Sequence, residues 1–196
     1  MNATVLILNN MTETIISIIL GIGLAASVGF RVFVPLFGLS LAAHFGMVPL
    51  NENWVWIGGN TALITLGIAT VVEIAAYLIP WLDHLLDVIT VPLATVAGTA
   101  VMVSTIANLD PTLTWALAII AGGGTATAIK ASTTSTRLAS TGTTAGLANP
   151  LITSVETGTS IGLSALAIFL PIVSFVVVVI IFWILYKVFK IIKIKK

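Results

Sequence analysis

The stretch from Pro171 to Val188, PIVSFVVVVIIFWILYKV, contains no charged residue before Lys187. A helix needs about 20 mostly apolar residues to cross the ~30 Å hydrocarbon core of a bilayer. Segments of this kind recur along the chain, which is 58% hydrophobic and 8% charged and has a mean hydropathy of +1.16. Soluble domains carry about a quarter charged residues. The sequence therefore predicts an all-α, polytopic transmembrane helix bundle in which residues 1–196 form a single domain.

Residues that typically start, break or end helices divide the chain into about six spans. The first expected segment, 14–45, would be about 48 Å long at 1.5 Å per residue, so we expect a break where Gly29 and Pro35 bracket Arg31. Asp110-Pro111 and Asn149-Pro150 are typical helix starts, since proline fits the first helical position. Five spans are the alternative. The other expected spans cover approximately residues 54–79, 81–106, 112–130, 150–170 and 171–188.

Basic residues indicate the orientation. Five lysines lie within the last ten residues of the chain, and lysine near a span end favours the cytoplasmic side. We therefore expect residues 189–196 to be a basic cytoplasmic tail. Six spans would return the N-terminus to the same side. The chain is thus expected in the cell (plasma) membrane with both termini in the cytoplasm.

A weak internal repeat relates residues 14–106 to residues 112–188. Similar small-residue segments begin at Gly21 and Gly122, and each precedes an arginine; Thr70-Val-Val-Glu73 later matches Thr153-Ser-Val-Glu156. Three spans per half would insert in opposite senses, which is typical of inverted-repeat transporters with broken or re-entrant helices. The alternative is the composition that closely packed membrane helices share.

Polar and charged residues within the apolar spans are the main functional candidates. A charge at the bilayer centre costs about 2.5–3.5 kcal/mol on insertion scales, so it faces the bundle or a wet cavity and finds a partner. We expect each arginine to pair with a glutamate, which leaves one lysine to attract an anion. Structural ion pairs are the alternative. The candidate substrate- or ion-binding residues are Arg31, Glu73, Lys130, Arg137, Asn149 and Glu156.

The most polar part of the chain runs from Gly122 to Pro150, where Ser and Thr supply eleven residues. Lys130 and Arg137 are seven residues apart and so share a helix face. Two cations among hydroxyls, opposite the helix start at Asn149, would suit an anion. Tight packing of small residues against a neighbouring helix is the alternative.

A second polar group comprises Asp83, His84 and Asp87. Two carboxylates four residues apart beside an imidazole could bind a hard divalent cation, although an interfacial helix start also explains them. No catalytic residues are assigned and no cofactor is expected. The chain has no cysteine, which excludes disulfides and thiolate sites, and its net charge of +1 does not favour nucleic acid.

The order and spacing of these residues resemble a known family. Glu73-x6-Pro80-x2-Asp83-x3-Asp87, then Lys130-Ala131 with Arg137 downstream, then Asn149-Pro150-x5-Glu156, is similar to a family of small prokaryotic integral membrane proteins catalogued as domain of unknown function 4126. The resemblance covers about residues 20–171. It implies the architecture and supplies no activity.

Three functions remain open at this point. The preferred hypothesis is a small transporter or channel for a small solute or ion, with an anion as one candidate. The alternatives are a membrane-embedded enzyme acting on lipid or polyprenyl phosphates, and a structural or accessory membrane subunit. The expected partners are the lipid bilayer and a small ion, and the sequence is compatible with a homo-oligomer.

Overall fold

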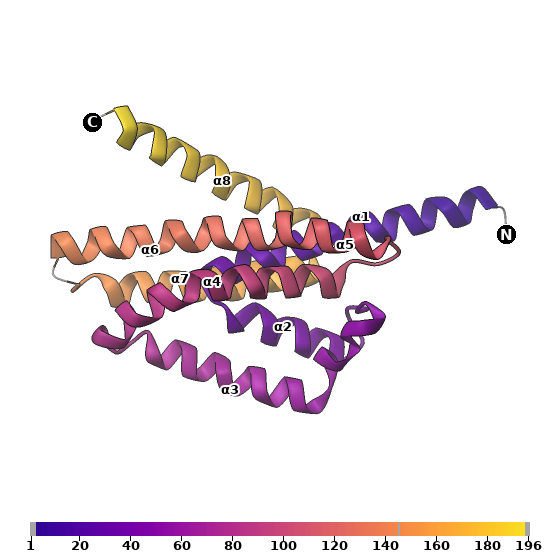
Figure 1. The fold of residues 1–196 in the computed structure, drawn as a ribbon, viewed down its shortest axis with the longest axis horizontal. Coiled ribbons are helices and arrows are strands. Elements are labelled where there is room, and N and C mark those ends of the chain that lie inside the picture. The colour runs from indigo at the N-terminus through magenta and orange to yellow at the C-terminus, as the bar shows by residue number, and fades with distance from the viewer. Residues whose placement is uncertain (1–2, 145, 195–196) are drawn as a thin grey trace.

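Helices account for all the regular secondary structure in the part of the chain that the computed structural model describes, residues 3–144 and 146–194. For residues 3–7, 80–81, 83–84 and 192–194 the description is limited to the backbone. The predicted all-α, polytopic bundle is confirmed (Figure 1). The elements are α1 (Ala3–Phe30), α2 (Phe33–His44), η1 (Glu52–Gly58), α3 (Asn60–Ala76), α4 (Pro80–Thr105), α5 (Pro111–Leu117), η2 (Ala118–Gly123), α6 (Gly124–Thr144), α7 (Asn149–Phe169) and α8 (Pro171–Ile194).

Five helical segments of the described chain are long and apolar enough to cross a membrane: Leu8–Phe30, Leu85–Thr105, Pro111–Thr144, Asn149–Phe169 and Pro171–Ile191. The pair η1 and α3 is bent by 61° and could supply a sixth span, whereas α2 is a shorter apolar helix. These numbers agree with the expected five or six spans.

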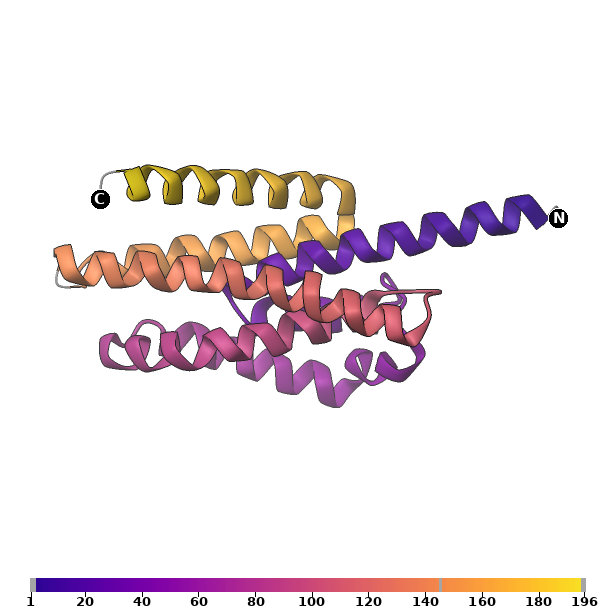
Figure 2. The same ribbon diagram turned by 45° about the horizontal axis from the view of Figure 1, so that its top comes forward.

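The first long apolar segment breaks at Arg31, as the sequence predicts. α1 ends at Phe30 and α2 begins at Phe33, with Pro35 in the first turn of α2, where a missing N–H costs nothing. α2 then runs back toward the end of the bundle from which α1 came (Figures 1 and 2). The backbone N–H of Ala107 donates to the Ser17 hydroxyl at 3.1 Å, and the first part of α1 projects past the bundle (Figure 1).

The serine- and threonine-rich stretch is helical, so the expected end of the fourth span near residue 130 is wrong. α5, η2 and α6 follow one another without interruption from Pro111 to Thr144. Hydroxyls of this stretch donate to the carbonyl one turn earlier, as Thr127 does to Gly123 at 2.7 Å and Ser135 to Ala131 at 2.7 Å. Such back-bonding satisfies the hydroxyls without breaking the helix.

Glycines bring α4 and the π-helical turn η2 into backbone contact. A Cβ on Gly98 would lie 2.5 Å from the Ala126 Cβ and 2.8 Å from the Gly122 carbonyl oxygen. A Cβ on Gly122 would lie 2.6 Å from the Gly98 carbonyl oxygen. Small residues allow membrane helices to approach this closely.

The bundle buries charged side chains among its apolar core residues, and its outer surface is apolar. Its largest fully buried side chains are Arg31, Arg137 and Lys130, whereas Ile64, Ile68 and other large apolar residues of α3 are exposed. In water this distribution would be costly, because exposed apolar patches of this extent drive association. It is the distribution expected of helices whose outer faces contact lipid.

The two termini lie at opposite ends of the bundle (Figures 1 and 2). We call the end where α6 and α8 finish the tail end; α3 also ends there, and α4 and α7 begin there. This arrangement differs from the expected return of both termini to one side. The difference arises because α1 turns back at Arg31 and does not continue to the tail end.

Replacing Gly98 with alanine should destabilise the bundle by about 1–3 kcal/mol, because the new methyl group overpacks the contact with η2. Gly158→Ala is the matched control, since a Cβ there meets no atom within 4 Å. Thermal unfolding of both variants in the same detergent measures the difference. Equal stability of the two variants would contradict the close contact.

Candidate functional site

Tyr77 lies at the centre of a buried charge cluster. Its side chain is 3% exposed and follows the last turn of α3. The ring centroid lies 3.9 Å from Arg31 Cζ, 4.7 Å from Arg137 Cζ and 5.0 Å from Lys130 Nζ. A desolvated cation–π contact stabilises by about 2 kcal/mol. One aromatic side chain therefore interacts with three buried cations.

Glu156 of α7 connects the two arginines. Arg137 Nε donates to both carboxylate oxygens at 3.2 Å, and Arg137 Nη2 also contacts Glu156 Oε2. Arg31 Nη2 lies 3.6 Å from the same Oε2. The neighbouring Thr153 accepts from both arginines, through its hydroxyl from Arg137 at 2.9 Å and through its carbonyl from Arg31 at 3.2 Å. One turn of α7 thus binds both guanidinium groups.

Asp87 of α4 supplies a third anion, which the sequence analysis had assigned to the metal hypothesis. Its Oδ1 lies 4.0 Å from Lys130 Nζ and 3.9 Å from Arg137 Nε. Lys130 Nζ also donates to the Tyr77 hydroxyl at 2.9 Å. The idea that Lys130 has no obvious anionic partner is therefore wrong.

Glu73 binds the backbone at the break between α1 and α2. The N–H of Val32 donates to Oε1 at 2.8 Å, and the N–H of Phe33 donates to Oε2 at 2.9 Å. The amino end of a helix carries unpaired N–H groups and a partial positive charge, so it stabilises a carboxylate. The glutamate is 6% exposed. The start of α2 thus binds a carboxylate of the cluster, whereas the sequence indicated a helix start opposite the cations at Asn149.

The cluster is formally neutral. It contains three cations (Arg31, Lys130, Arg137) and three carboxylates (Glu73, Asp87, Glu156), all buried. Asp87, Arg137 and Glu156 each lie seven residues from the end of their helix at the tail end. At 1.5 Å per residue the cluster is about 10 Å inside that end.

Two donors at the cluster lack a hydrogen-bond partner within the described chain: Arg31 Nη1 and Thr134 Oγ1. Arg31 is 0% exposed. Thr134 is four residues after Lys130 and three before Arg137, so these three side chains share one face of α6. A buried donor without an acceptor costs about 1–3 kcal/mol. Both groups could donate to a bound acceptor.

The remaining predicted site residues lie elsewhere. Asn149, at the start of α7, is buried and donates to the Thr141 hydroxyl at 3.2 Å. The side chains of Asp83 and His84 fall outside the described part of the structure. Among the residues that are described, no group of three or more potential metal ligands occurs.

The sequence analysis missed Tyr77, Thr153 and Thr157 as site residues. Tyr77 lies four residues after Glu73, one helical turn away, so the spacing could have placed both on the same face. Thr157 accepts a hydrogen bond from Arg31 Nε at 3.0 Å and lies next to Glu156. Polar residues one turn from a buried glutamate are the signal that could have identified Tyr77 and Thr153; the sequence offers no comparable signal for Thr157.

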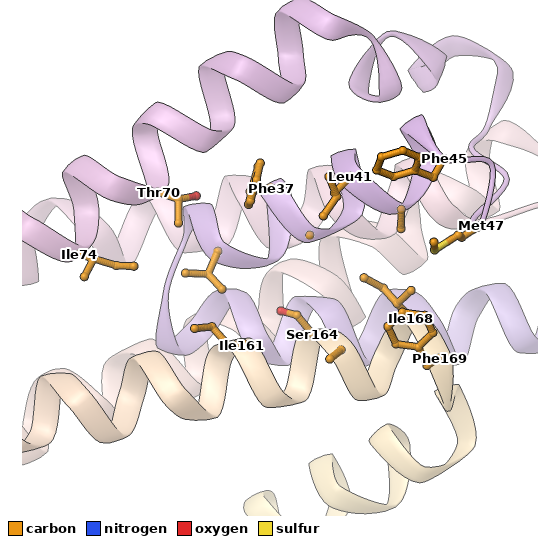
Figure 3. Close-up of a pocket in the computed structure, with 14 residues that line it drawn as sticks. Phe37, Leu41, Phe45, Met47, Thr70, Ile74, Ile161, Ser164, Ile168 and Phe169 are labelled. Atoms are coloured by element: carbon orange, nitrogen blue, oxygen red, sulfur yellow. The ribbon is translucent and has the colours of Figure 1, made fainter.

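An apolar groove of about 510 Å³ lies beside the cluster, between α2, α3 and α7 (Figure 3). Its walls include Phe37 and Leu41 of α2, Ile74 of α3 and Ile161 of α7. Ile74 follows Glu73 in the chain, so this part of the groove adjoins the cluster. Polar groups in its lining are limited to hydroxyls such as those of Thr70 and Ser164. The groove itself therefore suits hydrocarbon, and the charge cluster is the candidate functional site.

Substitutions of Tyr77 should distinguish the contribution of its ring to stability from that of its hydroxyl. Tyr77→Phe removes the contacts with Lys130 and Thr90 and should cost about 1–3 kcal/mol. Tyr77→Leu should cost more, because it also removes three cation–π contacts of about 0.5–2 kcal/mol each. Unfolding of the purified variants in one detergent gives the order. If phenylalanine and leucine were equally destabilising, the ring would not be stabilising the cations.

The comparisons with known proteins identify a family. No match is found among curated proteins or among solved structures. The family model described as Domain of unknown function (DUF4126) matches residues 18–190, which is most of the chain and includes every member of the charge cluster. The protein is thus a membrane protein with apolar helices, and it belongs to the DUF4126 family.

Proposed function

We propose that the protein is a small transporter or channel for a small solute or ion, with the charge cluster around Tyr77 as its binding centre. The observation that carries the proposal is the burial of six ionisable side chains within a bundle whose outer surface is apolar. Each charge buried in a membrane helix is costly, and such residues are commonly found on substrate and ion pathways.

Features around the cluster favour a site that binds something over a purely structural one. A structural ion-pair cluster is best satisfied completely, because every unpaired donor adds a cost. Here Arg31 Nη1 and Thr134 Oγ1 have no partner in the described residues. The helix break at Arg31 also places backbone N–H groups beside the cations, as in transporters with discontinuous helices.

We further propose that the tail end faces the cytoplasm and that the opposite end, with the N-terminus, faces away from it. The proposal rests on the distribution of lysine and arginine. Lys187 and Lys190 lie near the end of α8, whereas the chain before Arg31 and the connection 45–59 contain neither residue type. The proposed membrane is the cell membrane. The 3+3 inverted repeat is the alternative to this orientation, because its six spans would bring both termini to one side of the membrane; the convergence of Arg31 and Arg137 on one tyrosine favours it.

Glu156→Gln should abolish flux while keeping the fold, because it removes the charge shared by both arginines and keeps the shape of the side chain. The assay uses purified protein in liposomes under an imposed potassium diffusion potential. Proton flux is followed with an internal pH dye and chloride flux with an electrode. Glu52→Gln is the control, since Glu52 is exposed on η1. Parallel loss of flux and thermal stability would favour a structural role, as would the absence of flux in the native protein.

The proposed orientation can be tested with single cysteines, because the chain has none of its own. Thr4 precedes the Leu8–Phe30 segment, Glu52 begins η1, and Thr144 ends α6, which finishes at the tail end (Figure 1). In intact cells, an impermeant thiol reagent should label Thr4→Cys and Glu52→Cys but not Thr144→Cys. Labelling of Glu52→Cys without Thr4→Cys would restore the expectation that both termini are cytoplasmic.

A further inference from the structure

The Glu73 carboxylate has the geometry of an anion bound at a helix N-terminus. Its two oxygens accept from the successive N–H groups of Val32 and Phe33 at 2.8 and 2.9 Å. Arg31 precedes Val32 in the chain, and Lys130 donates to the hydroxyl of Tyr77, which lies one turn from Glu73. Free carboxylates and phosphates bind helix amino ends through the same groups. Here a side chain of the protein occupies that position.

The helix that carries Glu73 is the least embedded part of the site. α3 packs mainly against α2 and η1, and its buried residues are Ala62, Glu73 and Ala76. Most of its other residues face outward, including the exposed Ile64, Ile68 and Val71. Glu73 and Tyr77 are one turn apart at its end and together cover the cations. A displacement of this end of α3 would withdraw both side chains from the cluster.

The charge that remains without Glu73 is that of a site for a monovalent anion. Three cations and two carboxylates, Asp87 and Glu156, leave a net charge of +1. Arg31, whose side chain is 0% exposed, has one donor, Nη1, without a partner among the described residues. An anion can only accept hydrogen bonds, so it can accept from this guanidinium group as well as from the two backbone N–H groups.

We infer that Glu73 occupies a binding position for a small monovalent carboxylate, formed by the amino end of α2 with Arg31 and Lys130. The substrate exchanges with the Glu73 side chain when the end of α3 moves. A carboxylate fits better than a monatomic ion, because the two N–H groups bind two oxygens of one planar group. This inference rests on the proposed transport function and names its substrate class.

Chemical rescue tests the inference. Glu73→Ala removes a CH₂–COO⁻ fragment, which acetate matches in size and charge. The purified full-length variant in detergent should have a lower Tm than the native protein. Sodium acetate should raise the Tm of Glu73→Ala well above the effect of sodium gluconate at equal ionic strength, because a ligand that binds the folded state stabilises it. The native protein, whose position is occupied, should respond less.

Two controls test whether the rise in Tm is specific to position 73 and to a charged ligand. Glu52→Ala removes an exposed glutamate of η1 and should show no acetate-specific shift. Acetamide has the shape of acetate without its charge and should not rescue Glu73→Ala. An equal response of Glu73→Ala to acetate and to gluconate or acetamide would overturn the inference.

A second measurement applies if Glu73→Ala does not fold. Ala62 and Ala76 are buried alanines near opposite ends of α3, so each can be replaced by a single cysteine in the otherwise native chain. Acetate should accelerate thiol labelling of Ala76→Cys several-fold and leave Ala62→Cys unchanged. No acceleration at Ala76→Cys, or equal acceleration at both positions, would overturn the proposed exchange.

The outcomes separate this inference from the transport proposal. Acetate rescue without flux of protons, chloride or radiolabelled acetate in liposomes would support the binding position and reject transport. Flux that depends on Glu156 without acetate rescue would support transport and reject a carboxylate at Glu73.

Discussion

The burial of three cations around Tyr77 is the constraint on which the arrangement of the helices depends. Like charges a few ångströms apart repel strongly in a medium of low dielectric constant, so each cation needs compensation at short range. The tyrosine ring provides some of it, and carboxylates from α3, α4 and α7 provide the rest. Because the three carboxylates come from three different helices, a shift of any one of these helices would leave a charge without its compensation.

The break between α1 and α2 belongs to the same network. In a continuous helix the N–H groups of Val32 and Phe33 would bond to carbonyls one turn earlier. The break directs them to Glu73, and a capping interaction of this kind stabilises by about 0.5–2 kcal/mol. Arg31 can then place its guanidinium group between Tyr77 and α7. The irregular backbone is tolerated because it is covered by protein and not by lipid.

The sequence was sufficient where one chemical rule dominated. The apolar runs predicted the spans, and the length of the first run with Gly29 and Pro35 predicted the break at Arg31. The pairing of Arg137 with Glu156 follows from the cost of burying either alone. The sequence was insufficient where the role of a residue depended on how the helices pack against one another. Tyr77 resembles an ordinary interfacial aromatic residue, and Asp87 shares a helix face with Asp83, so its role with Lys130 depends on how α4 packs against α6.

The neutrality of the cluster constrains how an anion could enter. Adding an anion to three cations and three carboxylates would leave a net negative charge in a medium that penalises it, so entry requires that a carboxylate leaves. Glu156 is bound by both arginines, and Asp87 lies between Lys130 and Arg137. Glu73 is bound by backbone groups and sits on a helix with few buried residues. Its displacement with the end of α3 also withdraws Tyr77, but it leaves the ion pairs of Glu156 and Asp87 in place, so exchange at Glu73 is the entry route that keeps these ion pairs.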